Sequence, residues 1–599
     1  MEMKKGMINT EIAELLRAVA ASYQLKDEKR NKFRIIAYER AADAVEHASS
    51  ELKDLWDEGK LDDIPGVGKS ISDHLGELFK SGKSKHFEEV MKDLPKSMFD
   101  LMMIPGVGAK RAYRLATEFN ITGKNPIDAL KKLAMEGKIA GLEGFGEDLE
   151  KAIISSIEEV KGREFRLLLP YAMQIANDII TWMKKSKAVL KADALGSLRR
   201  HTSTVGDVDI AVSSNDPEAV IKHFTEFPNM TRILEKGDRT ASIVIPGSKQ
   251  VDLMVEKPES YGSLLQHFTG SKHHNIAVRE YALKKGYSVS DYGINILDKN
   301  KRRKELKKFE SEEDFYKFLG MEWIPPELRE GTGEVNASLK NELPDLVKLK
   351  DIKADLQIHS DFDIETSHDL GMSTMEEIVQ MSNNLGYEYV AFTEHNPSHS
   401  RHTKSRIIDL LKAKKERVDE INLTVVKSVK GSFKKVFNSL EIDILPDGSL
   451  PVPEEGLSYL DFALVSVHSS FRLDRDKMTQ RVLTGLNHPK VKIFAHPTAR
   501  LLNEREGIEL DWEKIFDFCL KNNKWIEINA DPKRLDLPDF LVREAVKKGI
   551  KLTLGTDAHH KDMMNNMEFA VSVARRGWAE KNDIINTCGL IEFEKLVGM

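Results

Sequence analysis

Two runs of residues decide the fold of the middle of this chain, Gly196-Ser197-Leu198-Arg199-Arg200 and Val205-Gly206-Asp207-Val208-Asp209-Ile210-Ala211-Val212. In the second run apolar and polar residues alternate, which predicts a strand. Asp207 and Asp209 then lie on one face, with Cα atoms roughly 6–7 Å apart. That separation suits oxygens that bridge two cations roughly 3.5–4 Å apart. Mg²⁺ is favoured because it binds carboxylates and phosphates at the same time.

The first run predicts a phosphate-binding turn. Backbone N–H groups of the Gly-Ser pair bind one phosphate, and Arg199 or Arg200 binds another in a bidentate way. A metal-binding carboxylate pair beside such a turn is typical of nucleotidyl transfer. The alternative is a solvated Asp-x-Asp at a strand edge, which the Gly-Ser and Arg-Arg pairs upstream disfavour.

The composition is that of a multidomain globular protein. The chain has 599 residues, of which 41% are hydrophobic and 31% are charged, and this length predicts about three to five domains. We expect no membrane segment, because no run of about eighteen apolar residues occurs. Cys519 and Cys588 are the only cysteines, which leaves no disulfide framework and indicates a reducing cytoplasm. The net charge of −6 gives no argument for nucleic acid, whose binding depends on local basic patches.

A glycine motif near the N-terminus predicts contacts with a DNA backbone. Ile64-Pro65-Gly66-Val67-Gly68-Lys69 recurs as Ile104-Pro105-Gly106-Val107-Gly108-Ala109, and Leu142-Glu143-Gly144-Phe145-Gly146 is a looser third copy. The motif resembles the helix-hairpin-helix, whose Gly-x-Gly turn exposes N–H groups at a helix N-terminus. Such donors bind phosphate and do not distinguish base sequence. The alternative is that the hairpin has only a structural role. The candidate DNA-binding residues here are Gly66, Gly68, Gly106 and Gly108.

Two later segments extend the predicted site. The run 250–255 is typical of a strand in the same sheet, and Asp252 points away from its apolar neighbours. It is the candidate third carboxylate, which would act as a base for an attacking hydroxyl and as a metal ligand. Downstream, Phe268-Thr269-Gly270 precedes a predicted helix on which Asn275 and Arg279 share a face. That face suits an incoming nucleotide and a template strand.

Together these residues resemble a family X DNA polymerase, over about residues 10–335. The family implies an N-terminal helical domain that binds a 5′ end in a gap, then fingers, palm and thumb. It also implies template-directed gap filling with two Mg²⁺ or Mn²⁺ ions. It assigns catalysis and metal binding to Asp207, Asp209 and Asp252, and template contact to Arg279. It assigns nucleotide binding to Gly196, Ser197, Arg200, Gly206, His267, Phe268, Gly270 and Asn275.

Two positions depart from the family pattern. Family members that excise a 5′-deoxyribose phosphate use a lysine nucleophile on the helix after the first hairpin, where this chain has His74. An imidazole forms no imine, so we expect no lyase activity unless Lys69 points to the same side. His267 stands where the family usually has tyrosine, which leaves the discrimination against ribonucleotides open.

Beyond residue 350 the ligand-type residues follow apolar runs. His395, His468, His496 and His559 each come after such a run, as does Glu441. Buried strands that end in such residues, with helical patterns between them, describe a β/α barrel with its site at the carboxyl ends of the strands. Mixed His, Asp and Glu ligands suit Zn²⁺, Mn²⁺ or Fe²⁺, and such a cluster activates water for phosphoester hydrolysis. One such histidine is more often structural, but five ligands in register argue for a metal site.

This half of the chain resembles a PHP phosphoesterase domain, over about residues 352–580. The family uses a His-x-His pair on its first strand, and here Gln357 replaces the first histidine, so one metal of the cluster is expected to be weak or absent. Asp361, Asp363 and Asp369 compete for the early acidic ligand, and Asp369 fits best. The expected metal ligands are His359, Asp369, His395, Glu441, His468, His496, Asp557 and His559.

The expected fold is therefore multidomain. It comprises an α-helical helix-hairpin-helix N-terminal domain, an α+β nucleotidyltransferase palm with a thumb, and a C-terminal distorted TIM-like β/α PHP barrel. The expected segments are a 5′-end-binding domain (1–92), fingers (93–165), palm (166–258), thumb (259–335), a linker (336–351) and the PHP domain (352–599).

The expected function is that of a monomeric, cytoplasmic repair enzyme with two active sites. It would fill gapped or nicked DNA with dNTPs in base excision repair, and its C-terminal half would act as a 3′–5′ exonuclease or process 3′ ends or abasic sites. Two alternatives stay open. The C-terminal half is only a platform that positions DNA, or the whole chain is chiefly an end-binding scaffold with a slow polymerase.

Overall fold

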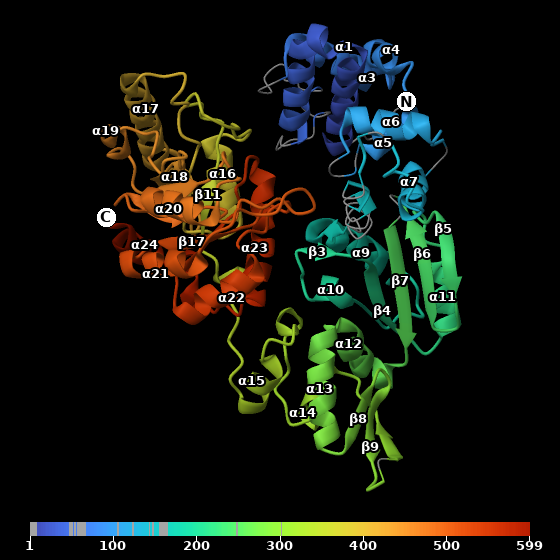
Figure 1. Ribbon diagram of the computed structural model, residues 1–599. Coiled ribbons are helices and arrows are strands. Elements are labelled where there is room, and N and C mark those ends of the chain that lie inside the picture. Colours follow the sequence, from blue (N-terminus) through green and yellow to red (C-terminus); the bar gives the residue numbers. More distant parts are fainter. Residues whose placement is uncertain are drawn as a thin grey trace. The chain divides into compact units, whose positions relative to one another are not determined.

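The computed structural model describes most of the chain (Figure 1). The described residues are 9–46, 52, 56, 61, 67–102, 104, 107–122, 125–142, 144–146, 149–151, 153–154, 166–246, 249–300 and 302–599. The chain divides into two compact units, residues 1–164 and residues 165–599. In the described part of the chain, every helix is too short or too polar to cross a membrane.

The first unit is helical. Its helices are α1 (Asn9–Glu46), α3 (Lys69–Ser81), α4 (Lys85–Met91), α5 (Lys96–Leu101), α6 (Ala109–Glu118) and α7 (Pro126–Met135). Helix α1 has a kink at Asp27. In α3 the apolar residues Ile71, Leu75 and Leu78 recur at helical spacing and are buried, which explains why this stretch forms a helix and where it packs. Gly82 ends α3 in the left-handed conformation, at φ 75°.

A five-stranded sheet occupies the segment expected to be the palm (166–258), in the order β2-β4-β7-β6-β5. Helices α9 and α11 cover the face that carries Val208, Ile210 and Val212, and α12 packs on the opposite face against Ala211. The predicted neighbouring strands are therefore confirmed, with β4 and β7 parallel. The elements are β1 (Leu167–Leu168), α9 (Leu169–Met183), β2 (Lys191–Ala194), α10 (Gly196–Arg199), β3 (Thr204–Val205), β4 (Val208–Ser213), α11 (Pro217–Phe224), β5 (Arg232–Lys236), β6 (Thr240–Ile245) and β7 (Lys249–Glu256).

The thumb region combines two helices with a three-stranded antiparallel sheet and further short helices. Phe315, Tyr316 and Ile324 form the centre of its core and are fully buried. Its elements are η2 (Pro258–Ser260), α12 (Tyr261–Thr269), α13 (Lys272–Lys284), β8 (Tyr287–Ser290), β9 (Gly293–Leu297), β10 (Arg303–Lys307), α14 (Glu312–Phe318), η3 (Pro326–Leu328) and α15 (Glu334–Lys340).

The segment 336–351, expected to be a linker, is more structured than its polar composition suggests. It contains most of α15 and the short helix η4 (Leu349–Asp351). Leu346 and Val347 are buried, and the N–H of Val347 donates to the carbonyl of Ala579 at 3.0 Å. These two apolar side chains hold the segment against the C-terminal region.

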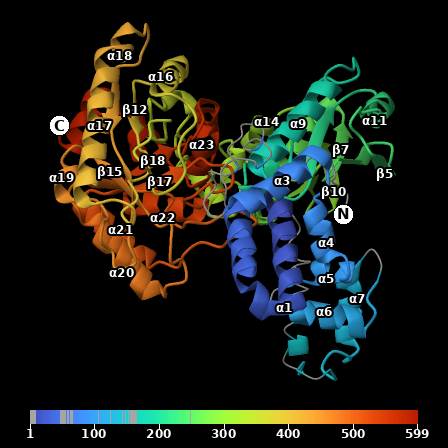
Figure 2. The same cartoon turned by 90° about the horizontal axis from the view of Figure 1, so that it is seen from above.

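The C-terminal region alternates parallel strands with helices (Figure 2). Two parallel sheets, β11-β12-β13 and β14-β15-β16-β17-β18, are joined at both edges by parallel bridges, His395 with Glu441 and Ile358 with Ala558. The strands are buried along almost their whole length, as expected where helices cover a parallel sheet. They are β11 (Ala354–Ile358), β12 (Tyr389–Phe392), β13 (Lys435–Asn438), β14 (Glu441–Asp443), β15 (Ala463–Ser466), β16 (Val491–Phe494), β17 (Trp525–Asn529) and β18 (Leu552–Gly555).

The helices of this region surround the strands in Figure 2. They are α16 (Met375–Asn384), α17 (Lys404–Leu423), α18 (Val425–Ser428), α19 (Glu454–Leu457), α20 (Arg475–Leu486), α21 (Trp512–Asn522), α22 (Asp539–Lys548), η5 (Lys561–Asn566), α23 (Met567–Arg576), η6 (Lys581–Asp583), η7 (Ile585–Thr587) and α24 (Leu590–Val597).

Candidate active sites

Three carboxylates meet at the centre of the palm sheet. Asp209 on β4 lies directly opposite Asp252 on β7 in the parallel register, and Asp207 immediately precedes β4. Gln250 donates to both carboxylate oxygens of Asp252, at 3.0 and 3.1 Å. Burial, together with the charges of Asp252 and Asp207, raises the pKa of Asp209 to about 7. Such a concentration of negative charge fits divalent cations, which would relieve the repulsion.

The Gly-Ser turn lies against these carboxylates. Gly196 adopts φ 58°, and a Cβ atom at this position would lie 2.6 Å from a carboxylate oxygen of Asp209. Only glycine therefore allows both the left-handed turn and the close approach. The N–H of Leu195 donates to the carbonyl of Asp209 at 2.8 Å, which fixes the turn at the end of the strand.

The two arginines after the turn both contact Thr269 but pair with different carboxylates. Arg199 donates to both carboxylate oxygens of Glu312 on α14, at 3.0 and 2.7 Å, and so connects the palm to the thumb. Arg200 donates to the carbonyl of Thr269 at 2.5 Å and to Glu330 at 2.9 Å. Its guanidinium lies at the turn where Gly270 has φ 69°, and a Cβ there would lie 3.2 Å from it. Arg199 Nη1 also donates to the hydroxyl of Thr269 at 2.6 Å, so both arginines lie at this predicted sugar-binding turn, and Arg199 is the one that is ion-paired with Glu312.

The predicted nucleotide-facing residues of α12 and α13 contact one another. Asn275 donates to the carbonyl of His267 at 2.7 Å and accepts a hydrogen bond from Gln266 at 2.9 Å. Arg279 Nη2 lies 3.3 Å from Nδ1 of His267, whose ring packs edge-on against Phe268. The structure thus brings this group together. Gln266 was missed because its side chain follows no motif.

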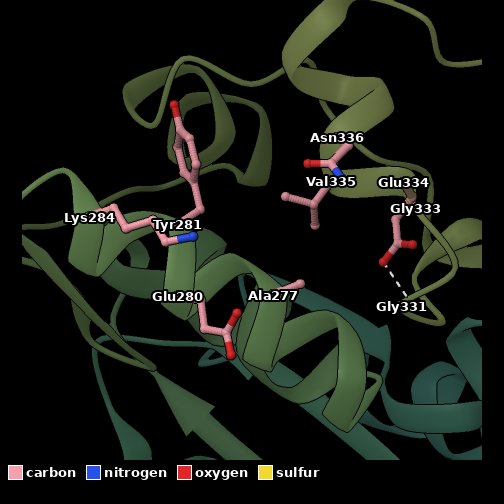
Figure 3. A pocket seen from close by; sticks show the side chains of 9 residues that line it. All are labelled: Ala277, Glu280, Tyr281, Lys284, Gly331, Gly333, Glu334, Val335 and Asn336. Carbon is pink, nitrogen blue, oxygen red and sulfur yellow. Dashed lines mark hydrogen bonds between the residues drawn. The ribbon is translucent and has the colours of Figure 1, made fainter.

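A cleft of about 320 Å³ lies on the opposite face of α13 (Figure 3). Its lining residues are Ala277, Glu280, Tyr281, Lys284, Gly331, Gly333, Glu334, Val335 and Asn336. These helix positions are turned away from Asn275 and Arg279 at 3.6 residues per turn. The cleft is therefore separate from the nucleotide-facing group.

The helix-hairpin-helix prediction falls partly within the described residues. Gly68 and Gly108 each precede a helix, α3 and α6, and no other atom lies within 4 Å of a Cβ built at either position. The backbone at both helix N-termini is therefore open to close approach by a phosphate. Gly66 and Gly106 lie outside the described residues. His74 stacks on His86 at 4.2 Å between ring centroids.

A second cluster lies at the carboxyl ends of the C-terminal strands, as predicted. Glu441 is its centre, since its two oxygens lie 2.8 Å from His496, 3.4 Å from His359 and His468, and 3.7 Å from His395. His359 also contacts Asp557 at 3.1 Å, and its ring stacks on that of His559 at 4.3 Å. Burial disfavours a charged His359, but Asp557 and Glu441 outweigh burial and raise its pKa to about 10.

The cluster fits metal ions. Groups of three ligand atoms lie within 4.8 Å of one another, for example in His395, Glu441 and His468. Among the described residues, a buried ring nitrogen without a hydrogen-bond partner occurs in each of His359, His395, His496 and His559. Unpartnered buried imidazole nitrogens beside carboxylates are what a metal site requires.

The position of the missing histidine is filled by hydrogen bonds. Gln357 donates to Glu441 at 2.7 Å, and Asn529 donates to Gln357 at 3.4 Å and to Asp557 at 3.2 Å. The Gln357 amide therefore binds Glu441 directly. In the family pattern a histidine stands at this position and would bind a metal. Sequence reasoning missed Asn529, which lies at the end of β17 and carries no ligand-type side chain.

The sequence indicated Asp369 as the best candidate for the early acidic ligand, but the structure brings His368 and Asp443 together with His468 instead. His368 contacts both oxygens of Asp443 at 3.0 and 3.1 Å, and Asp443 contacts His468 at 2.7 Å. His368, Asp443 and His468 form one of the groups suited to a metal, whereas Asp369 belongs to none of those found in the described residues. Asp369 is near enough for its charge to favour the protonated forms of His368 and His559.

Two family models match the chain. A helix-hairpin-helix domain matches residues 7–84, and the thumb of DNA polymerase beta matches residues 264–330.

Curated relatives match longer stretches. DNA polymerase/3′-5′ exonuclease PolX of Bacillus subtilis (strain 168) is 31% identical over 590 residues, which cover 98% of this chain and 99% of that protein. DNA polymerase lambda of Rattus norvegicus is 23% identical over 349 residues, which cover 54% of this chain and 56% of that protein. A probable phosphatase of Thermoanaerobacter sp. (strain X514) is 23% identical over 225 residues, which cover 36% of this chain and 84% of that protein. Because the first similarity spans almost the whole chain, and because the two family models match on either side of the carboxylate-bearing sheet, the chain belongs to the family X DNA polymerases.

Proposed function

We propose that this chain fills short gaps in DNA by two-metal nucleotidyl transfer in the palm. The observation that carries the proposal is the direct pairing of Asp209 with Asp252 beside the Gly-Ser turn. With Mg²⁺ or Mn²⁺ bound by Asp207, Asp209 and Asp252, the site gains the positive charge that activates a 3′-hydroxyl and neutralises a triphosphate.

The remaining residues of this site bind and orient the substrates. Ser197 and Arg200 hold the triphosphate, with Gly196 and Gly206 shaping the turn around it. His267, Phe268 and Gly270 line the sugar, and Asn275 meets the nucleotide. Arg279 faces the template. Asp252 accepts the proton of the attacking hydroxyl, and Gln250 orients its carboxylate.

We propose that residues 1–165 bind the DNA around the gap. Gly68 and Gly108 would present backbone N–H groups to phosphates on either side of the break, together with Gly66 and Gly106. Contacts between backbone N–H groups and phosphates do not depend on base sequence, which suits a repair polymerase that acts on any gap.

We propose that residues 352–599 form a PHP barrel that hydrolyses phosphoesters at DNA 3′ ends. The proposed ligands of Zn²⁺, Mn²⁺ or Fe²⁺ are His359, Asp369, His395, Glu441, His468, His496, Asp557 and His559. The metal-suited groups formed by His359, His395, Glu441, His468, Asp557 and His559 support this, His496 contacts Glu441 at 2.8 Å, and a similar protein is named a 3′-5′ exonuclease. With metal bound, the site supplies a hydroxide for attack on phosphorus.

Gap filling by an Asp252→Asn variant tests the polymerase proposal. We expect loss of single-nucleotide insertion by about 10³-fold or more, because the amide removes a metal ligand and a base without changing shape. Asp216→Asn is the matched control, since Asp216 only caps α11. Equal insertion by Asp252→Asn and wild type would overturn the assignment.

Hydrolysis of a labelled single strand by a His395→Ala variant tests the exonuclease proposal. His395 belongs to two of the groups suited to a metal, so shortening should be lost. His488→Ala is the control, because the His488 ring contacts Glu454 and the backbone N–H of Lys490 and belongs to none of the metal-suited groups of the described residues. If wild type shortens no 3′ end with Mn²⁺ or Zn²⁺, the platform alternative holds instead.

A further inference from the structure

The last turn of α23 places two arginines from the C-terminal region against the polymerase region. Arg575 donates to Glu327 at 2.7 Å and to the carbonyl of Val347 at 3.1 Å. Arg576 makes a separate set of contacts that reaches the nucleotide site. Arg575 and Arg576 are consecutive residues of one helix, but their side chains bind different partners.

Arg576 is held firmly. Its side chain is 7% exposed, and Asp539 at the start of α22 accepts from Nε at 2.8 Å and lies 2.5 Å from Nη2. Its other terminal nitrogen, Nη1, donates to the backbone carbonyl of Arg200 at 2.7 Å and to Glu330 Oε1 at 2.9 Å. One guanidinium thus fixes both the main chain of Arg200 and a carboxylate beside it.

The same oxygen of Glu330 is shared with the side chain of Arg200, whose Nε donates to it at 2.9 Å. Arg200 is further restrained by the hydrogen bond from Nη1 to the carbonyl of Thr269. Within the described residues, its Nη2 has no hydrogen-bond partner. The guanidinium is therefore oriented by two contacts, with one nitrogen left for a ligand.

The charges in this chain of contacts balance. Arg200 and Arg576 carry two positive charges, and Glu330 and Asp539 carry two negative ones. Without Arg576, Asp539 would lose the guanidinium that it contacts through two nitrogens. Glu330 would also be free to neutralise Arg200 alone.

We propose that Arg576 is a positioning residue of the polymerase, through which the C-terminal region completes the triphosphate-binding side of the nucleotide site. The inference rests on the proposed role of Arg200 in gap filling. Arg576 touches no reacting atom and acts through Glu330 and the backbone of Arg200.

Steady-state gap filling by the full-length Arg576→Met variant tests this inference. We expect the KM for the incoming dNTP to rise about tenfold. The reason is that Arg576→Met loses the charge-assisted contacts with Glu330 and with the backbone of Arg200, which orient Arg200 toward the triphosphate. We expect kcat to change by less than about threefold, since the carboxylates are untouched. Arg575→Met is the matched control, and its KM should stay within about twofold of wild type because its partners do not reach Arg200.

Further variants separate a specific role from general damage. Arg576→Lys should give an intermediate KM, because an ammonium replaces part of the contact set, and it serves as the test if Arg576→Met does not fold. In a Glu330→Gln background, Arg576→Met should raise KM much less than in wild type, because both act on one carboxylate. 3′-End hydrolysis should be unchanged in both arginine variants.

Two results would overturn the inference. One is a KM in Arg576→Met equal to that of Arg575→Met, and the other is a fall in kcat with unchanged KM. Absence of gap filling by the wild-type protein would instead contradict the proposed function itself. The two failures are therefore distinguishable.

Discussion

At the residue scale, the palm site depends on a glycine that no side chain can replace. Gly196→Ala would place a methyl group 2.6 Å from the Asp209 carboxylate and keep φ at 58°. We expect gap filling to fall by about 10²-fold or more, because the carboxylate must move from its metal-binding position. The measurement is single-turnover insertion into a one-nucleotide gap.

Gly286→Ala is the control for this prediction. Gly286 has φ 81° with no other atom within 4 Å of the Cβ position, so the substitution costs about 1–3 kcal/mol of backbone strain without a clash. It should lower thermal stability and leave insertion almost unchanged. Equal losses of insertion in both variants would mean that strain, and not contact with Asp209, explains the first result.

Glu441 is the residue on which the second site most depends, because four histidines and Gln357 surround its carboxylate. Glu441→Gln should remove bound metal and abolish 3′-end hydrolysis, while gap filling stays near wild type. Metal content by plasma mass spectrometry and a labelled-strand assay measure the two effects. Glu454→Gln, a surface pair with His488, is the control, and retention of metal by Glu441→Gln would contradict the assignment.

At the element scale, α10 and α14 are joined by a buried ion-pair group. Glu312 accepts from Arg199 at 2.7 Å and from Arg329 at 2.5 Å. Burial alone would raise the pKa of Glu312, but the two arginines outweigh burial and lower it to about 2. Glu312→Gln should destabilise the thumb by about 3–5 kcal/mol at neutral pH, because two buried cations lose their partner.

The sign of the pH dependence follows from the lowered pKa. A carboxylate with a depressed folded pKa stabilises the fold fully above its ordinary pKa of 4.5, and this contribution is lost as the pH falls toward 2. The difference in unfolding free energy between wild type and Glu312→Gln should therefore shrink across that window. A difference that grows on acidification would contradict this account.

Helix α3 carries the predicted departure from lyase chemistry. His74 stacks on His86, and neither imidazole forms an imine. We expect no borohydride-trapped adduct with a 5′-deoxyribose phosphate substrate. A trapped adduct that disappears in Lys69→Ala would show that Lys69 replaces the usual nucleophile.

Much of this architecture could be predicted from the sequence because the site residues sit at strand ends. Alternation placed Asp207 and Asp209 on one face of a strand and turned Asp252 away from its apolar neighbours, and the apolar runs placed the histidines at the carboxyl ends of the strands. The rest depended on long-range contacts that leave no local pattern. Nothing near Arg200 in the sequence indicates Glu330 or Arg576, and Gln357 reveals its role only beside Asn529. The segment 336–351 was misjudged because two buried apolar residues are too few to form a pattern.

At the scale of the whole molecule, the two proposed metal sites lie in one compact unit and their regions are connected through α23. Chelation should therefore stop both gap filling and 3′-end hydrolysis. Adding single metals back should distinguish the two activities. Mg²⁺ or Mn²⁺ should restore gap filling, because a site made only of carboxylates prefers these ions, whereas Zn²⁺ should restore only 3′-end hydrolysis at the imidazole-rich site. Recovery of both activities by Zn²⁺ alone would contradict two distinct sites.

The most direct test of the account follows one labelled primer in a one-nucleotide-gapped duplex, with Mg²⁺ or Mn²⁺, with and without dNTPs. Wild type is compared with Asp207→Ala/Asp209→Ala and with His468→Ala. The account predicts that extension is lost only in the aspartate variant and that shortening is lost only in the histidine variant. Absence of extension by wild type, or loss of both activities in either variant alone, would contradict it.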